Sequence, residues 1–312
     1  MEFERQLSHA FPVAGKKRKR PPMDRVYVCG MGGSGAVGDA LSAIQESRSP
    51  EIRTWKDYGL PKSENAGFIF SSFSGNTEET VSALSGALRD CPNRILGVAT
   101  SGGKLKRMAE KAGLPRVIIP AGNLTPREAL GYNVNASLTL LRSAFPSLRA
   151  PRVSLLSPSV LEARSGKLAG MIKGTIPLVY TEERDRVVGY AWKMHVNETG
   201  KTPCFINVLP EMGHNEIQSF ENGKNPFTAV FLVRGNAPQR IMKRVRASMK
   251  ILKKRNVRSV VVPLKGGNTA ERMWNGILLG AWTGLSLAKA GKRDPKGTPA
   301  IAELKKKMVS GK

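Results

Sequence analysis

Two short segments rich in glycine, serine and threonine could bind an anion. Residues 30–35 are Gly-Met-Gly-Gly-Ser-Gly, and residues 71–80 are Ser-Ser-Phe-Ser-Gly-Asn-Thr-Glu-Glu-Thr. The acidic pair near the end of the second segment is typical of the first turn of a helix. Backbone N–H groups, the helix dipole and hydroxyl donors would converge there on an anion. Because neither segment carries a basic side chain, we expect a phosphate monoester held by neutral donors.

Each segment taken alone has a second interpretation. Dinucleotide-binding proteins share such a glycine-rich turn and carry an acidic residue about twenty residues further on. Asp57, after the second expected strand, could serve as that residue. The serine-rich segment could also be a turn that only caps a helix. Together the two segments favour a phosphate-binding cup, which we expect to consist of Gly33, Ser34, Ser72, Ser74 and Thr77.

Alternating apolar and amphipathic segments would place both motifs at one edge of a sheet. Strands are expected at residues 25–30, 51–55, 67–71, 94–99 and 116–119, and helices at 33–45, 77–88, 104–112 and 126–145. This alternation predicts an α/β fold with a parallel, doubly wound sheet. Open sheets of this kind bind ligands beyond the carboxyl ends of their strands, which is where both motifs fall.

The same alternation resumes after a turn-rich linker at residues 146–158. Strands are expected at 176–180, 202–207, 228–233 and 258–262, and helices at 186–197, 239–252, 268–290 and from Thr298-Pro299 onward. At roughly 150 residues per domain, 312 residues suit two domains. We therefore expect two doubly wound parallel-sheet domains, at residues 25–150 and 151–312, after a basic N-terminal arm at residues 1–24.

The charge balance suggests an anionic partner. The chain has 50 basic and 24 acidic side chains, a formal net charge of +26, and its one dense basic run is at residues 16–20. Nucleic acid is the first class of partner to consider for such a chain. No RNA-binding motif or zinc finger accompanies the charge, and aromatic residues make up only 6%. We therefore do not expect specific nucleic-acid binding, and we interpret the charge as a solvated basic surface that favours anionic substrates.

The cysteines favour a protein of a reducing compartment, and the hydropathy predicts no membrane-spanning segment. Its three cysteines, Cys29, Cys91 and Cys204, are far apart and match no zinc-ligand spacing. His195 and Glu198 could share a metal, but no third ligand has a suitable spacing, so we expect no metal and no other cofactor. No segment resembles a secretory signal or a membrane span, and we expect a cytoplasmic protein.

The two anion-binding motifs, in this order and spacing, resemble the sugar isomerase (SIS) domain. From about residue 25 to residue 308 the chain resembles the archaeal bifunctional phosphoglucose/phosphomannose isomerases, which contain two flavodoxin-like SIS domains. Four further segments carry this resemblance: Thr-Pro-Arg-Glu-Ala-Leu at 125–130, Asn-Glu-Thr-Gly-Lys at 197–201, Leu-Pro-Glu-Met-Gly-His-Asn at 209–215, and Thr298-Pro299 with Leu304-Lys305. The chain departs from the family at its N-terminus, where the basic arm replaces a helical segment.

The resemblance implies an enzyme that interconverts fructose 6-phosphate with glucose 6-phosphate and mannose 6-phosphate through a cis-enediol(ate). It assigns proton transfer between C1 and C2 to Glu198, whose place at a helix C-terminal end suits a base. It assigns ring opening to His214 and Lys305, and stabilisation of the enediolate to Arg127, which cannot lose its proton. Thr298 would leave space for either C2 epimer in the substrate site.

The family also implies a partner and a place in metabolism. In relatives the histidine reaches the active site from the neighbouring subunit, so a homodimer is expected, with His214 contributed across subunits. A role in glycolysis, gluconeogenesis and carbohydrate metabolism follows from the substrates. Two alternatives remain open: another SIS enzyme acting on an aminosugar or hexulose phosphate, and a non-catalytic regulator that binds a sugar phosphate.

Overall fold

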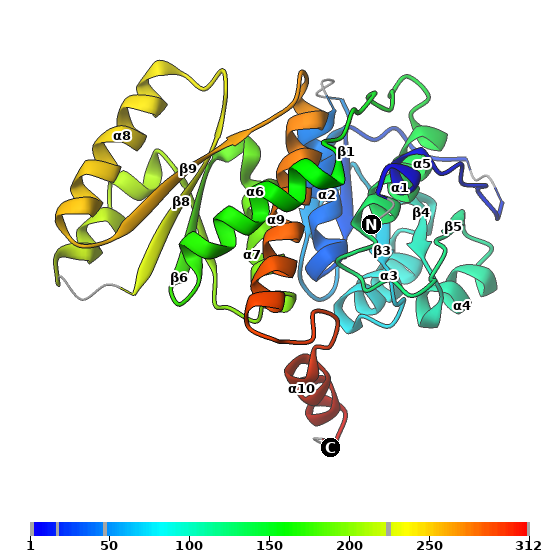
Figure 1. Ribbon diagram of the computed structural model, residues 1–312. Helices are drawn as coiled ribbons and strands as arrows, with labels where there is room; N and C mark the ends of the chain where they lie inside the picture. The colour runs from blue at the N-terminus through cyan, green and yellow to red at the C-terminus, as the bar shows by residue number, and fades with distance from the viewer. Residues whose placement is uncertain (1–2, 17–18, 46–48, 223–225, 311–312) are drawn as a thin grey trace. The chain divides into compact units, whose positions relative to one another are not determined.

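The computed structural model of the protein describes residues 3–16, 19–45, 49–222 and 226–310, in two units, Met1–Val153 and Ser154–Lys312 (Figure 1). Each unit contains one parallel sheet with helices on both faces, which confirms the expected doubly wound α/β fold. No helix in the described ranges is long and apolar enough to cross a membrane. Two members of the basic run, Lys17 and Arg18, lie outside the described residues.

Unit 1 has five parallel strands in the order β2-β1-β3-β4-β5, which is the flavodoxin-like order. The strands are β1 (Arg25–Cys29), β2 (Glu51–Trp55), β3 (Ala66–Ser72), β4 (Ile95–Thr100) and β5 (Arg116–Ile118). The helices are α1 (Phe3–Ser8), α2 (Gly32–Ile44), α3 (Glu78–Asp90), α4 (Gly103–Lys111) and α5 (Leu130–Ala144). Apolar residues of α3 and α4 pack on one face of the sheet, around Phe68 and Phe70, while α2 and α5 contact each other and the strands.

Unit 2 has four parallel strands in the order β7-β6-β8-β9, which repeats the order of the first four strands of unit 1. These strands are β6 (Ile176–Glu182), β7 (Phe205–Leu209), β8 (Phe227–Arg234) and β9 (Arg258–Leu264). Helix α8 (Gln239–Lys254) packs on one face, against Tyr180 and Phe231. Helix α9 (Thr269–Ala290) packs against both α6 (Pro158–Ile172) and α7 (Arg186–Glu198), and α10 (Pro299–Ser310) ends the chain (Figure 1).

Several expected boundaries were wrong. The helix expected from residue 126 begins at Leu130, because residues 126–129 form a turn in which the Glu128 carboxylate accepts hydrogen bonds from Thr125 N and Oγ1, both at 2.8 Å. The strand expected from residue 202 begins at Phe205, because Thr202 N donates to Val196 O at the end of α7. Helix α6 was not expected: it begins at Pro158, the last residue of the expected linker, and Ser157 caps it by accepting from Val160 N.

Candidate functional site

The glycine-rich and serine-rich loops lie side by side in unit 1. They follow the neighbouring strands β1 and β3 at their carboxyl ends, where the strand order reverses. Phe73 N donates to Ser34 Oγ at 3.1 Å, which joins the two loops directly. This packing of the two loops requires glycine at position 30, since a Cβ there would lie 2.6 Å from Ser71 O. The two motifs expected to share one site are therefore adjacent.

Hydroxyl groups fix the shape of the serine-rich loop. Ser72 Oγ lies 2.9 Å from Thr77 Oγ1 and accepts from Gly75 N at 3.2 Å. Gly75 has a positive φ of 66°, and a Cβ there would lie only 1.8 Å from Gly102 O. Ser74 is exposed, and its Oγ accepts from Asn76 N. The hydroxyl groups therefore belong to a loop whose backbone conformation at residue 75 requires glycine.

Two helices begin at these loops, and their first turns carry no side-chain cap. Helix α2 starts after Met31 and α3 after Thr77, and neither residue makes a capping hydrogen bond with its side chain. The first N–H groups of a helix have no partner within the helix, so they are suited to bind an anion. Backbone donors and hydroxyls are therefore together at this edge of the sheet.

Arg127 belongs to the same edge of unit 1. The turn that contains it packs against the glycine-rich loop: a Cβ added at Gly33 would lie 3.0 Å from Pro126 O and 3.3 Å from Arg127 Cα. Arg127 itself is 3% exposed. The structure thus brings the backbone of Arg127 to the loop that contains Gly33 and Ser34.

In unit 2, Glu198 and the segment before α10 are held together. Glu198 is the last residue of α7 and is half-buried. Lys201, with a positive φ of 50°, donates from Nζ to the backbone oxygens of Glu198 and Gly297. Thr298 follows directly. Sequence reasoning gave Lys201 no role, although it lies in the Asn-Glu-Thr-Gly-Lys motif.

His214 lies on an exposed loop beyond the carboxyl end of β7. The loop starts with η3 (Glu211–Gly213) and continues into η4 (Glu216–Asn222). Tyr180 Oη donates to Glu216 Oε1 at 2.6 Å, and Asn207 Nδ2 donates to Glu216 Oε2 at 2.6 Å. Burial raises the pKa of the Tyr180 phenol, so it stays a donor. Sequence reasoning gave Tyr180 and Glu216 no role. The one available signal was that Glu216 lies two residues after His214.

Glu198 and His214 lie at opposite edges of the second sheet within one chain. Helix α7 starts where β6 ends at the carboxyl edge and returns to the amino edge, where β7 begins. Its 13 residues span about 20 Å. Glu198 ends this helix, whereas His214 follows the carboxyl end of β7. One unit therefore does not bring these two residues together.

Lys305 lies on α10, whose described side chains at residues 301–308 are all exposed. Ile301, Leu304 and Met308 form an apolar stripe at helical spacing and are 40%, 60% and 55% exposed. His195, which could have shared a metal with Glu198, is buried in α7. Within the described ranges, no three His, Cys, Asp or Glu side chains are grouped so that they could hold a metal ion.

The sequence matches a set of named relatives along most of its length. A protein of Aquifex aeolicus described as bifunctional phosphoglucose/phosphomannose isomerase is 30% identical over 92% of this chain and 91% of its own length. One of the same description from Caldicellulosiruptor bescii is 32% identical over 93% and 91%. This chain belongs to the bifunctional phosphoglucose/phosphomannose isomerase family. Residues 161–308 also match the family described as bacterial phospho-glucose isomerase C-terminal SIS domain.

Solved structures support the fold of this family member. The hypothetical protein TT0462 of Thermus thermophilus superposes with a TM-score of 0.69 at 17% identity, over 93% of this chain and 83% of that one. A putative phosphosugar isomerase of Silicibacter pomeroyi gives a TM-score of 0.60 at 17% identity, over 88% and 89%. These similarities confirm the expected α/β fold.

Proposed function

We propose that this chain interconverts fructose 6-phosphate with glucose 6-phosphate and mannose 6-phosphate. The similarity to named isomerases over most of the chain supports this function. The adjacency of the glycine-rich and serine-rich loops, at two helix N-termini without a side-chain cap, also supports it. Each unit would be one SIS domain, with the phosphate site in unit 1. The phosphate cup would consist of Gly33, Ser34, Ser72, Ser74 and Thr77.

Glu198 would act as the base that transfers a proton between C2 and C1. In the aldose-to-ketose direction its carboxylate takes the proton from C2, which gives a cis-enediol(ate), and then returns a proton to C1. A single carboxylate can serve both carbons if both lie on one side of it. Arg127 would stabilise the negative charge on the enediolate oxygen. Lys305 would assist ring opening, and Thr298 would contact the sugar, close to the end of α7.

His214 would act in the active site of a partner subunit. The placement of Glu198 and His214 at opposite edges of the second sheet supports this proposal, because one copy does not bring them together. The exposed apolar stripe on α10 also suits contact with a second copy. We therefore propose a homodimer that works in the cytoplasm, in glycolysis and gluconeogenesis. The three cysteines are free thiols, which agrees with a reducing compartment.

A related activity on another sugar phosphate is the second candidate. A protein of Sulfolobus acidocaldarius described as D-glucosamine-6-phosphate 4-epimerase is 30% identical over 64% of this chain. A coupled assay that starts from fructose 6-phosphate and measures glucose 6-phosphate and mannose 6-phosphate separately distinguishes the candidates. Formation of neither product, with turnover of glucosamine 6-phosphate, would favour the second candidate.

Glu198→Gln tests the proposed mechanism, because the amide keeps the shape of the side chain but cannot accept the proton. We expect kcat to fall roughly 10²–10⁴-fold with little change in KM. Deuterium exchange from solvent into C2 should fall in parallel. Glu162→Gln, at an exposed position of α6, is the matched control and should leave both constants unchanged. Exchange at the wild-type rate in Glu198→Gln would mean that the base lies elsewhere.

A further inference from the structure

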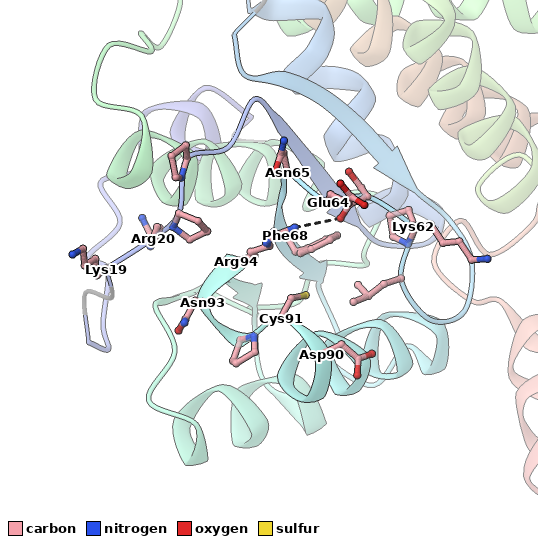
Figure 2. A pocket seen from close by; sticks show the side chains of 16 residues that line it. Lys19, Arg20, Lys62, Glu64, Asn65, Phe68, Asp90, Cys91, Asn93 and Arg94 are labelled. Carbon is pink, nitrogen blue, oxygen red and sulfur yellow. Dashed lines mark hydrogen bonds between the residues drawn. The ribbon is translucent and has the colours of Figure 1, made fainter.

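Figure 2 shows a pocket of about 1200 Å³ at the amino edge of the first sheet. The glycine-rich and serine-rich loops follow β1 and β3 at the opposite, carboxyl edge. Its walls come from three segments that each precede a strand: residues 19–22 before β1, 60–65 before β3, and 90–94 before β4. All of them belong to unit 1. None of the residues assigned to the isomerase site lines this pocket.

The basic arm forms one wall of the pocket and is fixed to the sheet. Ala14 and Arg116 exchange backbone hydrogen bonds of 3.0 and 2.8 Å, and Lys16 N donates to Gly113 O. Further along, Arg20 Nη2 donates to Leu96 O at 3.4 Å. Met23 packs against Gly67, where a Cβ would lie 2.7 Å from its sulfur. The described residues of the arm, on both sides of residues 17–18, are therefore held at the amino edge of the sheet.

Positive charge predominates in the pocket. Four basic side chains line it, Lys19, Arg20, Lys62 and Arg94, against the two carboxylates of Glu64 and Asp90. Asp90 is already neutralised, because Arg89 binds it through two hydrogen bonds of 2.8 and 2.9 Å. Arg20 Nε is buried and has no hydrogen-bond partner among the described residues. Burial of such a donor is costly, and a negative charge in the pocket would stabilise the guanidinium group that carries it.

The uncharged part of the lining combines four prolines and two apolar side chains with Cys91 and the polar residues Ser63, Asn65 and Asn93. Pro21, Pro22, Pro61 and Pro92 line the pocket together with Leu60 and Phe68. Proline fixes its backbone φ, so these walls keep their shape without a ligand. The volume exceeds that of a typical small-molecule site, about 300–1000 Å³. A ligand with a phosphate chain and a flat ring would match both the cations and the proline-lined wall.

We propose that this pocket is a second anion site that binds a nucleotide, with its phosphates on the basic side chains and its ring against the prolines. This assigns the basic arm a role as a wall of a binding site. Because the pocket and the sugar-phosphate loops lie at opposite edges of the sheet, the two sites can be tested independently.

Isothermal titration calorimetry with ATP tests the proposal on the full-length protein at 0.15 M salt, with fructose 6-phosphate present in excess. Lys19→Gln/Lys62→Gln removes two exposed charges from the pocket and should weaken ATP binding about tenfold, equivalent to about 1.4 kcal/mol. The matched control, Arg107→Gln/Lys111→Gln, removes the same charge from exposed positions on α4. We expect the control to bind ATP within a factor of two of the wild type, and KM for fructose 6-phosphate to be unchanged in both variants.

Three results would overturn the proposal. Equal weakening in the two double variants would show that ATP responds only to the net charge of +26. Absence of measurable ATP binding to the wild type would show that the pocket is no nucleotide site. Equally tight binding of inorganic triphosphate would show that the proline-lined wall contacts no ring, which would exclude the nucleotide class.

Discussion

At the scale of single residues, the hydroxyl groups of the proposed cup can still donate. Ser34 Oγ accepts from Phe73 N, and Ser74 Oγ accepts from Asn76 N, so each hydroxyl keeps its own hydrogen for another acceptor. Ser72 and Thr77 share one hydrogen bond, which leaves the pair one more hydroxyl hydrogen. A dianionic phosphate could therefore be held by neutral donors alone, as the lack of basic residues in both motifs predicts.

Removal of two of these hydroxyls should weaken substrate binding. We expect Ser74→Ala/Thr77→Ala to raise KM for fructose 6-phosphate roughly tenfold or more, at about 1–2 kcal/mol for each charge-assisted hydrogen bond lost. Steady-state kinetics on the folded variant measures this change. Ser85→Ala is the control, since Ser85 is exposed on α3 and donates only to Val81 O within the helix. An unchanged KM in the double variant would contradict the assignment of the cup.

At the scale of elements, the sequence predicted nearly all strands and helices but not how loops meet. Hydrophobic periodicity was enough for β1, β3, β4 and β6, because buried parallel strands are continuous apolar runs. Helix α6 was missed, although Ser157-Pro158 is a start signal and buried residues recur at Leu161, Ser165 and Leu168. Its place after a turn-rich stretch hid this pattern. The packing of the Arg127 turn on Gly33 depends on contacts between distant segments, which periodicity does not report.

The loop that carries His214 depends on one such distant contact. Glu216 is held from two strands, by Tyr180 of β6 and Asn207 of β7. We expect Tyr180→Phe to lower the free energy of unfolding by about 1–3 kcal/mol, because a half-buried carboxylate oxygen loses its donor. If Glu216 positions the loop, kcat on cyclic substrate should also fall while KM stays near its wild-type value.

Two measurements separate a positioning role from simple loss of stability. Urea denaturation gives the free energy of unfolding, and kinetics well below the melting temperature gives kcat and KM. A Tyr180→Phe variant that is less stable but has wild-type kcat would show that the contact does not position His214.

At the scale of the whole molecule, the two sheets share the order of their first four strands but carry different side chains at their carboxyl edges. In unit 1 the loops after β1 and β3 are rich in glycine and hydroxyls. The equivalent positions in unit 2, after β6 and at the end of β8, hold Glu182, Asp185 and Arg234. Arg234 binds Glu182 through hydrogen bonds of 2.8 and 3.2 Å and lies 3.1 Å from Asp185. Protein carboxylates thus occupy the side of the guanidinium that a phosphate could otherwise contact, which agrees with a single phosphate site in unit 1.

This buried cluster should contribute strongly to the stability of unit 2. All three side chains are only 6–7% exposed, so Arg234→Leu would leave two buried carboxylates without their cation. We expect a loss of about 3–5 kcal/mol in the free energy of unfolding at pH 7, measured by urea denaturation. Arg186→Leu is the control, because its ion pair with Glu183 is 59% and 67% exposed and should contribute at most about 1 kcal/mol.

The pH dependence of this loss identifies its cause. Burial raises the pKa of Asp185 and Arg234 opposes that shift, so removal of Arg234 should raise the pKa further. A carboxyl group whose pKa is higher in the folded than in the unfolded state costs stability as pH rises above its unfolded value, near 4. The destabilisation by Arg234→Leu should therefore be smaller at pH 5 than at pH 7, because the Asp185 carboxyl group takes up a proton more readily at the lower pH. A loss that is equal at both pH values would point instead to lost packing of the arginine stem.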